Sequence, residues 1–182
     1  MTYPTQEEIN KVHTQLVEMR YENFIHQDLF SFQWWFLLSL FVLPWILWWL
    51  LVDKNRIKDI WLFGSLISIL IITLDDLGIE LNLWYYPYQV LNIIPRLNPI
   101  DISVLPVFHM LVYQYFTKWK SFIIANILTA FLYAYLAEPL FVKINIYVLT
   151  NWDYIYSVPI YIGKAVLIKF ILEGVLLKSK GA

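Results

Sequence analysis

The sequence predicts an all-α fold, a bundle of five transmembrane helices preceded by an amphipathic N-terminal helix. Of the 182 residues, 60% are hydrophobic and only 15% are charged, whereas about 25% are charged in soluble domains. The apolar residues also gather into stretches that approach or exceed the roughly 20 residues a helix needs to cross a bilayer. We therefore divide the chain into an N-terminal arm, residues 1–32, and a transmembrane domain, residues 33–182.

The arm is expected to form the amphipathic helix. Thr5 and Glu8 fit a capping box, in which a threonine hydroxyl and a glutamate carboxylate accept hydrogen bonds from the first backbone amides of a helix. Apolar residues then recur at near-helical spacing, at Ile9, Val12, Leu16, Met19 and Phe24. Such a helix lies on the bilayer or packs against a partner protein, and this one lacks the basic face of a typical binder of anionic lipids.

The first expected span covers about residues 33–52. It belongs to a stretch of 24 residues, from Leu29 to Val52, that carries no charge. Pro44 falls inside the span, which membrane helices tolerate. The residues before it are too many and too acidic for a cleaved signal peptide.

The second span decides where the polar centre lies. The apolar run from Ile60 to Leu74 has 15 residues and reaches about 22 Å, which is too short to cross. Extending it to Glu80 gives 21 residues and about 31 Å. If residues 60–80 cross the membrane, the adjacent Asp75 and Asp76 must therefore enter it as well.

Three further spans are expected at about residues 101–117, 121–140 and 154–177. Two connections between spans, residues 81–99 and 140–153, are rich in aromatic residues. Because tryptophan and tyrosine prefer the membrane–water interface, we expect these connections to lie there or to re-enter the membrane.

The charged connections predict the orientation. The five spans leave seven lysines and arginines on one side and four on the other. The larger set comprises Lys54, Arg56, Lys58, Lys118, Lys120, Lys178 and Lys180. Positively charged loops stay in the cytoplasm. We therefore expect a multi-pass protein of the cell membrane with its N-terminus outside and its C-terminus cytoplasmic.

A set of ionisable residues is expected inside the membrane, mostly in its outer half. The set comprises Asp75, Asp76, Glu80, Asp101, His109, Glu138 and Lys164. A charge at mid-membrane costs about 2.5–3.5 kcal/mol on insertion scales, so such residues face the bundle interior, pair, or line water. We expect Lys164 within about 4 Å of Asp75 or Asp76, as a salt-bridge partner.

Plainer interpretations of these residues stay open. Glu80, Asp101 and Glu138 are compatible with an interfacial position against headgroups and water. His109 is compatible with an ordinary hydrogen bond between helices. Lys164 and the aspartates are compatible with a purely structural ion pair, although an intramembrane ionisable group is a functional candidate by default.

Several classes of site are excluded or unsupported. The chain has no cysteine, which excludes disulfides, thiol catalysis and thiolate metal ligands. Its net charge of −1 and the lack of a basic run give no support for a nucleic-acid partner. No zinc-protease, serine-hydrolase or phosphate-binding-loop motif occurs. Catalytic residues, metal ligands and cofactors are therefore left unassigned.

Short motifs spread over nearly the whole chain resemble a family of small multi-pass membrane proteins from spore-forming Gram-positive bacteria. They are His26-x-Asp28-Leu29-Phe30, Trp34-Trp35, Pro44-Trp45, Leu74-Asp75-x-x-Gly78, Trp84-Tyr85-Tyr86-Pro87, Pro99-x-Asp101, Leu105-Pro106-Val107, Tyr113-Gln114-Tyr115-Phe116, Trp119-Lys120, Glu138-Pro139 and Tyr156-Ser157-x-Pro159. The resemblance implies a membrane location and a multi-pass architecture but no mechanism. It favours Asp75 over Asp76 and adds weight to Glu138.

Three functions are compatible with this pattern. The leading hypothesis is a binding or transport module whose acidic pocket opens to the outside and takes a cation or a cationic small molecule. The second is a membrane-embedded enzyme that acts on a lipid or isoprenoid, with a carboxylate or His109 as general acid or base. The third is a structural or assembly protein whose N-terminal arm binds a partner protein.

Overall fold

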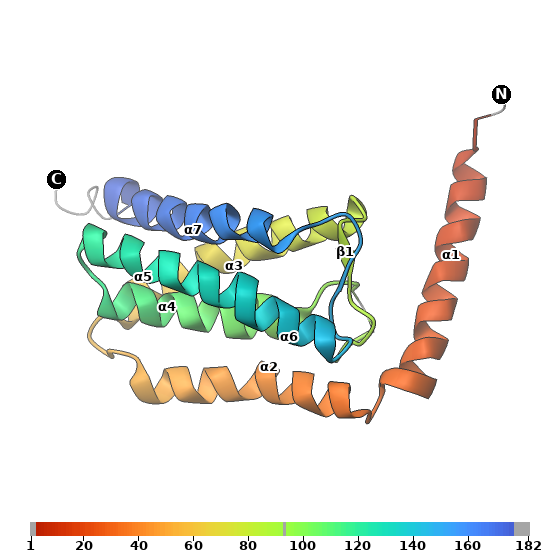
Figure 1. Ribbon diagram of the computed structural model, residues 1–182, viewed down its shortest axis with the longest axis horizontal. Coiled ribbons are helices and arrows are strands. Elements are labelled where there is room, and N and C mark those ends of the chain that lie inside the picture. The colour runs from red at the N-terminus through yellow and green to blue at the C-terminus, as the bar shows by residue number, and fades with distance from the viewer. Residues whose placement is uncertain (1–2, 93, 177–182) are drawn as a thin grey trace.

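The computed structural model describes residues 3–92 and 94–176, and most of these residues are helical. The α-helical segments are α1 (Gln6–Asn23), α2 (Phe32–Leu51), α3 (Ile57–Glu80), α4 (Leu105–Tyr115), α5 (Trp119–Leu132), α6 (Glu138–Lys143) and α7 (Tyr154–Ile171). Helices α2 to α7 run alongside one another, whereas α1 runs across one end of this bundle (Figure 1). The predicted all-α class is therefore confirmed.

Short π-helical turns, each five residues long, interrupt or extend these helices. They are Phe24–Asp28, Ile100–Val104, Tyr133–Ala137 and Leu172–Leu176. The turn at Tyr133–Ala137 joins α5 and α6 into one helix of 25 residues. The turn at Ile100–Val104 precedes α4 without a break.

In the described part of the chain four helices are long and apolar enough to cross a membrane, as expected of a multi-pass membrane protein. They are Phe32–Leu51, Ile57–Glu80, Trp119–Lys143 and Tyr154–Val175. The remaining expected span, residues 101–117, forms a helix from Ile100 to Tyr115. Its 16 residues extend about 24 Å, short of a typical hydrocarbon core. Five crossings are therefore not confirmed.

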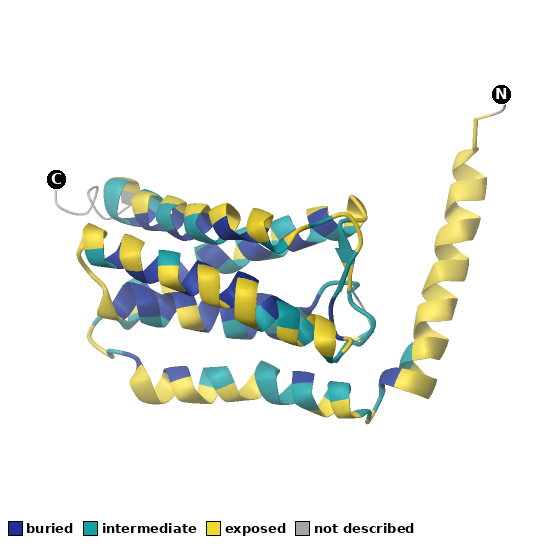
Figure 2. Cartoon of the chain, viewed as in Figure 1, coloured by how far each residue is buried: buried dark blue, intermediate teal, exposed yellow. Residues whose placement is uncertain are grey.

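The arm forms the expected capped helix. The Thr5 hydroxyl accepts a hydrogen bond from the Glu8 amide at 3.2 Å, and the Glu8 carboxylate accepts one from the Thr5 amide at 2.7 Å. No residue of α1 is buried, and the helix is exposed along its whole length (Figure 2). The apolar residues of α1 are therefore not covered by any other described part of the chain.

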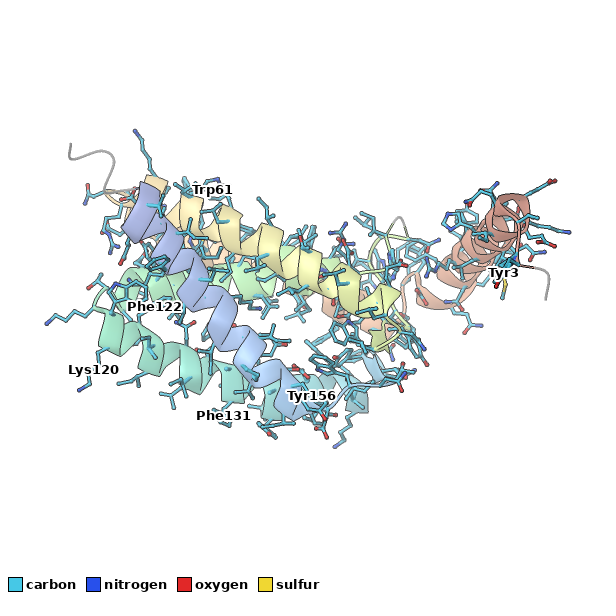
Figure 3. The ribbon with its side chains drawn as sticks, turned by 90° about the horizontal axis from the view of Figure 1, so that it is seen from above. Tyr3, Trp61, Lys120, Phe122, Phe131 and Tyr156 are labelled. Carbon is cyan, nitrogen blue, oxygen red and sulfur yellow. The ribbon has the colours of Figure 1, made fainter. Side chains whose placement is uncertain are left out.

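The two connections rich in aromatic residues meet at one end of the bundle. Strand β1 (Trp84–Tyr85) pairs with β2 (Val148–Leu149) in an antiparallel sheet, with Trp84 opposite Leu149. At this end α3 and α7 diverge towards Tyr156, whereas the later part of α7 lies over the start of α3 near Trp61 (Figure 3).

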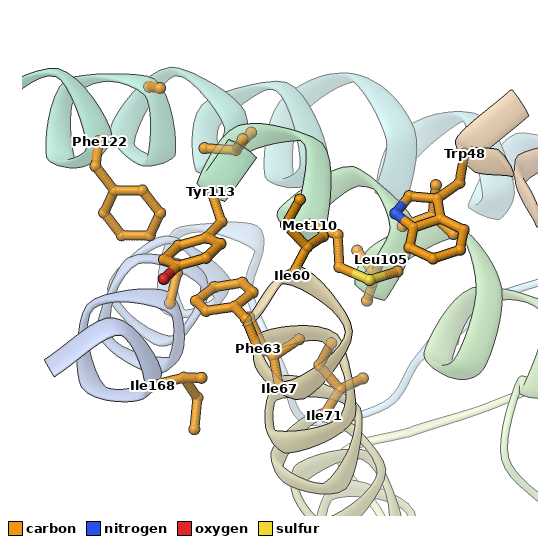
Figure 4. Packing of buried hydrophobic residues seen from close by; sticks show 14 of the residues in the cluster. Trp48, Ile60, Phe63, Ile67, Ile71, Leu105, Met110, Tyr113, Phe122 and Ile168 are labelled. Carbon is orange, nitrogen blue, oxygen red and sulfur yellow. The ribbon is translucent and has the colours of Figure 1, made fainter. Parts of the chain in front are cut away.

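The other end of the bundle holds the main hydrophobic core. The rings of Phe63 on α3 and Tyr113 on α4 stack at 4.4 Å, and Phe122 on α5 meets both edge-on (Figure 4). Helix α2 contributes little, since Leu37 and Trp48 are its only buried residues. The tight packing of α3, α4, α5 and α7 at this end leaves the opposite end of the bundle to hold a cavity.

Candidate functional site

A cavity of about 360 Å³ lies where α3 and α7 diverge. Its walls come from α3, the start of α4, α6, α7 and the connections that carry the small sheet. Most of the lining is apolar or aromatic. Four charged residues also line it, namely Asp75, Asp101, Glu138 and Lys164, and all four are buried.

Asp75 is held on α3 by aromatic side chains from the β1 connection. The Trp84 indole N–H donates to Asp75 Oδ1 at 2.9 Å, and the Tyr86 hydroxyl donates to the same oxygen at 2.5 Å. Trp84 reaches this position because Gly78 has no side chain: a Cβ there would lie 1.9 Å from the indole ring. The second oxygen of Asp75, Oδ2, is buried and has no hydrogen-bond partner among the described residues.

Asp101 lines the same cavity as Asp75. It belongs to the π turn Ile100–Val104, whose extra residue per turn changes the direction of the side chains that follow. Asp101 is only 3% exposed, and within residues 3–92 and 94–176 its Oδ2 also lacks a hydrogen-bond partner. Two adjacent carboxylates repel each other at low dielectric, and a cation bound between them removes that repulsion.

Glu138 follows the π turn Tyr133–Ala137 and bonds across to α7. Its carboxylate accepts hydrogen bonds from the Ser157 hydroxyl at 3.2 Å and from the Tyr161 hydroxyl at 2.8 Å. Within the same π turn Tyr133 lines the cavity, and its buried hydroxyl has no hydrogen-bond partner in the part of the chain that the structure describes. Two π turns thus supply residues to this one cavity.

The expected salt bridge of Lys164 is wrong. Among the described residues no carboxylate oxygen lies within 4.0 Å of its ammonium, which sits 4.5 Å from the centre of the Tyr161 ring. Lys164 is ten residues into α7 and Asp75 five residues from the end of α3. Lys164 therefore lies about 7 Å deeper in the bundle than Asp75.

Asp76 and Glu80 do not reach the cavity. Asp76 is about 100° around the helix from Asp75, and it pairs with Arg96 at 3.4 Å on the outer side of α3. Glu80, one turn further, is exposed. The interfacial interpretation therefore fits Glu80, whereas the burial of Asp101 and Glu138 excludes it for them.

His109 is buried next to the cavity but does not line it. Its Nδ1 lies 2.7 Å from the Leu105 carbonyl oxygen one turn earlier, and its ring is 6.0 Å from that of Tyr133. The histidine is thus hydrogen-bonded within its own helix rather than between helices.

Sequence reasoning missed the aromatic hydrogen-bond donors and one buried aspartate. Trp84 and Tyr86 were expected at the interface, and their spacing from Asp75 carries no signal for the contact. Asp28 is buried outside the spanning helices, and the Asn23 amide donates to it at 3.2 Å. Burial raises the pKa of Asp28 to about 6.

Within the described residues, no three histidine, aspartate or glutamate side chains converge closely enough to hold one metal ion. Comparisons with protein-family models, with curated proteins and with solved structures gave no match to this chain. The resemblance to a bacterial family of small multi-pass membrane proteins therefore stays a prediction.

Proposed function

We propose that this chain is an integral membrane protein of five crossings whose cavity binds an organic cation, as a binding or transport module. The observation that carries the proposal is the pair of unpartnered carboxylate oxygens, Asp75 Oδ2 and Asp101 Oδ2, on the cavity wall. A buried acceptor without a partner costs about 1–3 kcal/mol, and more when it is charged. A cation in the cavity would offset that cost.

The charge balance supports a positive ligand. Three carboxylates and one ammonium line the cavity, which gives a formal charge of −2 if all are ionised. Lys164 does not neutralise any of the carboxylates by direct contact. A site with excess negative charge in a low-dielectric surrounding favours a cation over a neutral or anionic molecule.

The walls support an organic cation in particular. Aromatic rings line much of the cavity, among them those of Trp84, Tyr86, Tyr147, Trp152 and Tyr161. Aromatic faces attract ammonium groups through their π electrons. The volume of about 360 Å³ falls at the lower end of the range for small-molecule sites, roughly 300–1,000 Å³.

Five crossings are supported by the order of the connections. The connections at residues 52–56 and 116–118 lie at one end of the bundle, and those at residues 81–99 and 144–153 lie at the other (Figure 1). This alternation requires α4 to run through the bundle like its neighbours. A span of about 24 Å is accommodated by local thinning of the bilayer at modest cost.

The second candidate function is a membrane-embedded enzyme acting on a lipid. Its support is that Asp75 and Asp101 are both buried on the wall of one cavity, because two neighbouring carboxyl groups that share one proton can serve as acid and base. A purely structural centre is less well supported, since one carboxylate oxygen each of Asp75 and Asp101 and the Tyr133 hydroxyl have no hydrogen-bond partner among the described residues.

The proposal is tested by melting the purified protein in detergent with tetramethylammonium chloride or with an equal concentration of sodium chloride. Bound ligand adds RT ln(1 + [L]/Kd), or about 2.7 kcal/mol at a concentration of 100 Kd. We expect stabilisation only by tetramethylammonium, and its loss in Asp101→Asn. Asp76→Asn is the matched control, because it makes the same aspartate-to-asparagine change at a residue that does not line the cavity. Equal melting temperatures in both salts would contradict the proposal.

A further inference from the structure

We propose that the cation carries an apolar tail, and that the tail leaves the cavity between α3 and α7 into the lipid. This inference rests on the proposed function and names its ligand class: a lipid-like amine or quaternary ammonium compound. It follows from where the cavity is exposed and where it is charged.

The exposed and the charged parts of the cavity wall are separate. Every charged lining residue is buried. The exposed lining residues are Leu77, Leu81 and Ile160, at 52%, 67% and 36%. These three apolar residues, which we call the rim, come from α3, its C-terminal end and α7. The cavity therefore opens past apolar side chains and is charged only in its interior.

The rim lies on the flank of the bundle. Leu77 and Ile160 belong to two helices that are long and apolar enough to cross a membrane. These helices diverge towards Tyr156, which leaves the space between them at the side of the bundle (Figure 3). In a bilayer this flank faces lipid, so the rim meets acyl chains rather than water.

The opposite direction, towards the end of the bundle, is covered by aromatic rings. Trp84 meets Trp152 edge-on at 5.1 Å, and Tyr86 stacks on Tyr147 at 5.6 Å. The pairing of β1 with β2 holds these residues together. A hydrated ion approaching from this end meets four rings, whereas an alkyl chain on the flank meets only the rim.

An amphiphilic cation matches both the charged interior and the apolar rim of the cavity. Its charged head group would lie near Asp75 and Asp101, because a charge is costly to leave in hydrocarbon. Its chain would pass the rim and continue into the bilayer, where apolar groups are solvated by acyl chains. A short cation would occupy the same head-group position without touching the rim.

The test compares two probes, tetramethylammonium and dodecyltrimethylammonium, on protein in nanodiscs of zwitterionic lipid. The rim variant is Leu77→Phe with Ile160→Phe. The matched control is Leu167→Phe, since Leu167 is also exposed, at 48%, and lies two turns from Ile160 on the same face of α7 without lining the cavity. Melting temperature is recorded with each probe.

We expect both probes to stabilise the parent and the control. In the rim variant the phenyl rings occupy the path of the chain, so stabilisation by dodecyltrimethylammonium should be lost while that by tetramethylammonium is kept. The remaining stabilisation by tetramethylammonium also shows that the rim variant is folded. If the double variant does not fold, the single variant Ile160→Phe is used in its place.

The outcomes separate the two proposals. If both probes stabilise the rim variant as much as they stabilise the parent, the inference about the tail is overturned and the proposed cation site stands. The same holds if dodecyltrimethylammonium fails to stabilise the parent while tetramethylammonium succeeds. If neither probe stabilises the parent, the proposed function fails, and the tail with it.

Discussion

Gly78→Ala is the substitution that tests the construction of the cavity wall most directly. An alanine Cβ at this position would lie 1.9, 2.2 and 2.5 Å from three carbons of the Trp84 indole. These distances are far below van der Waals contact, so either the indole or α3 must move. If the indole moves, its hydrogen bond to Asp75 at 2.9 Å is broken.

The expected loss of stability is that of the less costly of the two movements, of the indole or of α3. Loss of a hydrogen bond to a charged group costs about 1.5–3 kcal/mol, and forcing an extra methyl group into a packed interior costs about 1–3 kcal/mol. Alanine gains about 0.5–1 kcal/mol over glycine in a helix. We therefore expect Gly78→Ala to lower the free energy of unfolding by about 1 kcal/mol, within a range of about 0–2.5 kcal/mol.

The assay is unfolding in detergent followed by tryptophan fluorescence, with Gly163→Ala as control. A Cβ at Gly163 on α7 meets nothing within 4 Å, so this variant should be unchanged or slightly more stable. Stabilisation by tetramethylammonium should weaken in Gly78→Ala and persist in Gly163→Ala. Equal stability of the two variants, with equal responses to the cation, would refute the role given to Gly78.

Three further predictions follow from other parts of the chain. Burial raises the pKa of Asp28 from 3.8 to about 6, so the folded state binds the carboxyl proton more tightly than the unfolded state does. The melting temperature should therefore fall as the pH rises from about 4 to 6, and it should fall less in Asp28→Asn. Lys169 is fully buried and donates to the Thr117 carbonyl at 3.0 Å and to a partly exposed Glu173 at 2.7 Å. Lys169→Met should therefore cost about 3 kcal/mol in chemical unfolding, the lower end for a broken buried pair. For the orientation, single cysteines at positions 5 and 91 should react with an impermeant thiol reagent from outside, and one at position 55 should not; the reverse pattern would overturn it.

The positions of the helices could be predicted from the sequence because a membrane leaves the backbone few alternatives. Unpaired amides and carbonyls are costly in hydrocarbon, so a long apolar stretch must form a helix. Each of the five expected spans coincides with a helical segment to within three residues over the described part of the chain. The length of α4 shows the limit of this reasoning, since a stretch of apolar residues does not specify how many of them enter the helix.

The arrangement inside the cavity could be predicted only in part. The set of candidate residues contained the four that line it, because charges in apolar stretches are conspicuous. Which of two adjacent aspartates faces inwards depends on the rotation of α3. A signal was present: Asp75 continues the buried series Ile60, Phe63, Ile67 and Ile71, whereas Asp76 does not. The aromatic hydrogen bonds depend on contacts between distant segments, which local spacing does not encode.

The π turn at Tyr133–Ala137 makes the effect of a one-residue deletion depend on where in the helix it falls. A π turn holds one residue more than an α turn, so deleting Leu136 would let the helix close into a regular α-helix. Glu138 would then keep its face relative to α5, because the lost residue is the extra one that the wide turn accommodates. The same deletion within α5 would instead rotate everything after it by about 100°, and Glu138 would turn away from Ser157 and Tyr161 with the hydropathy of the segment almost unchanged. Among homologues of this chain, a one-residue gap within α5 would therefore mark a different pocket as surely as replacement of the carboxylate itself, whereas a gap at the π turn would not.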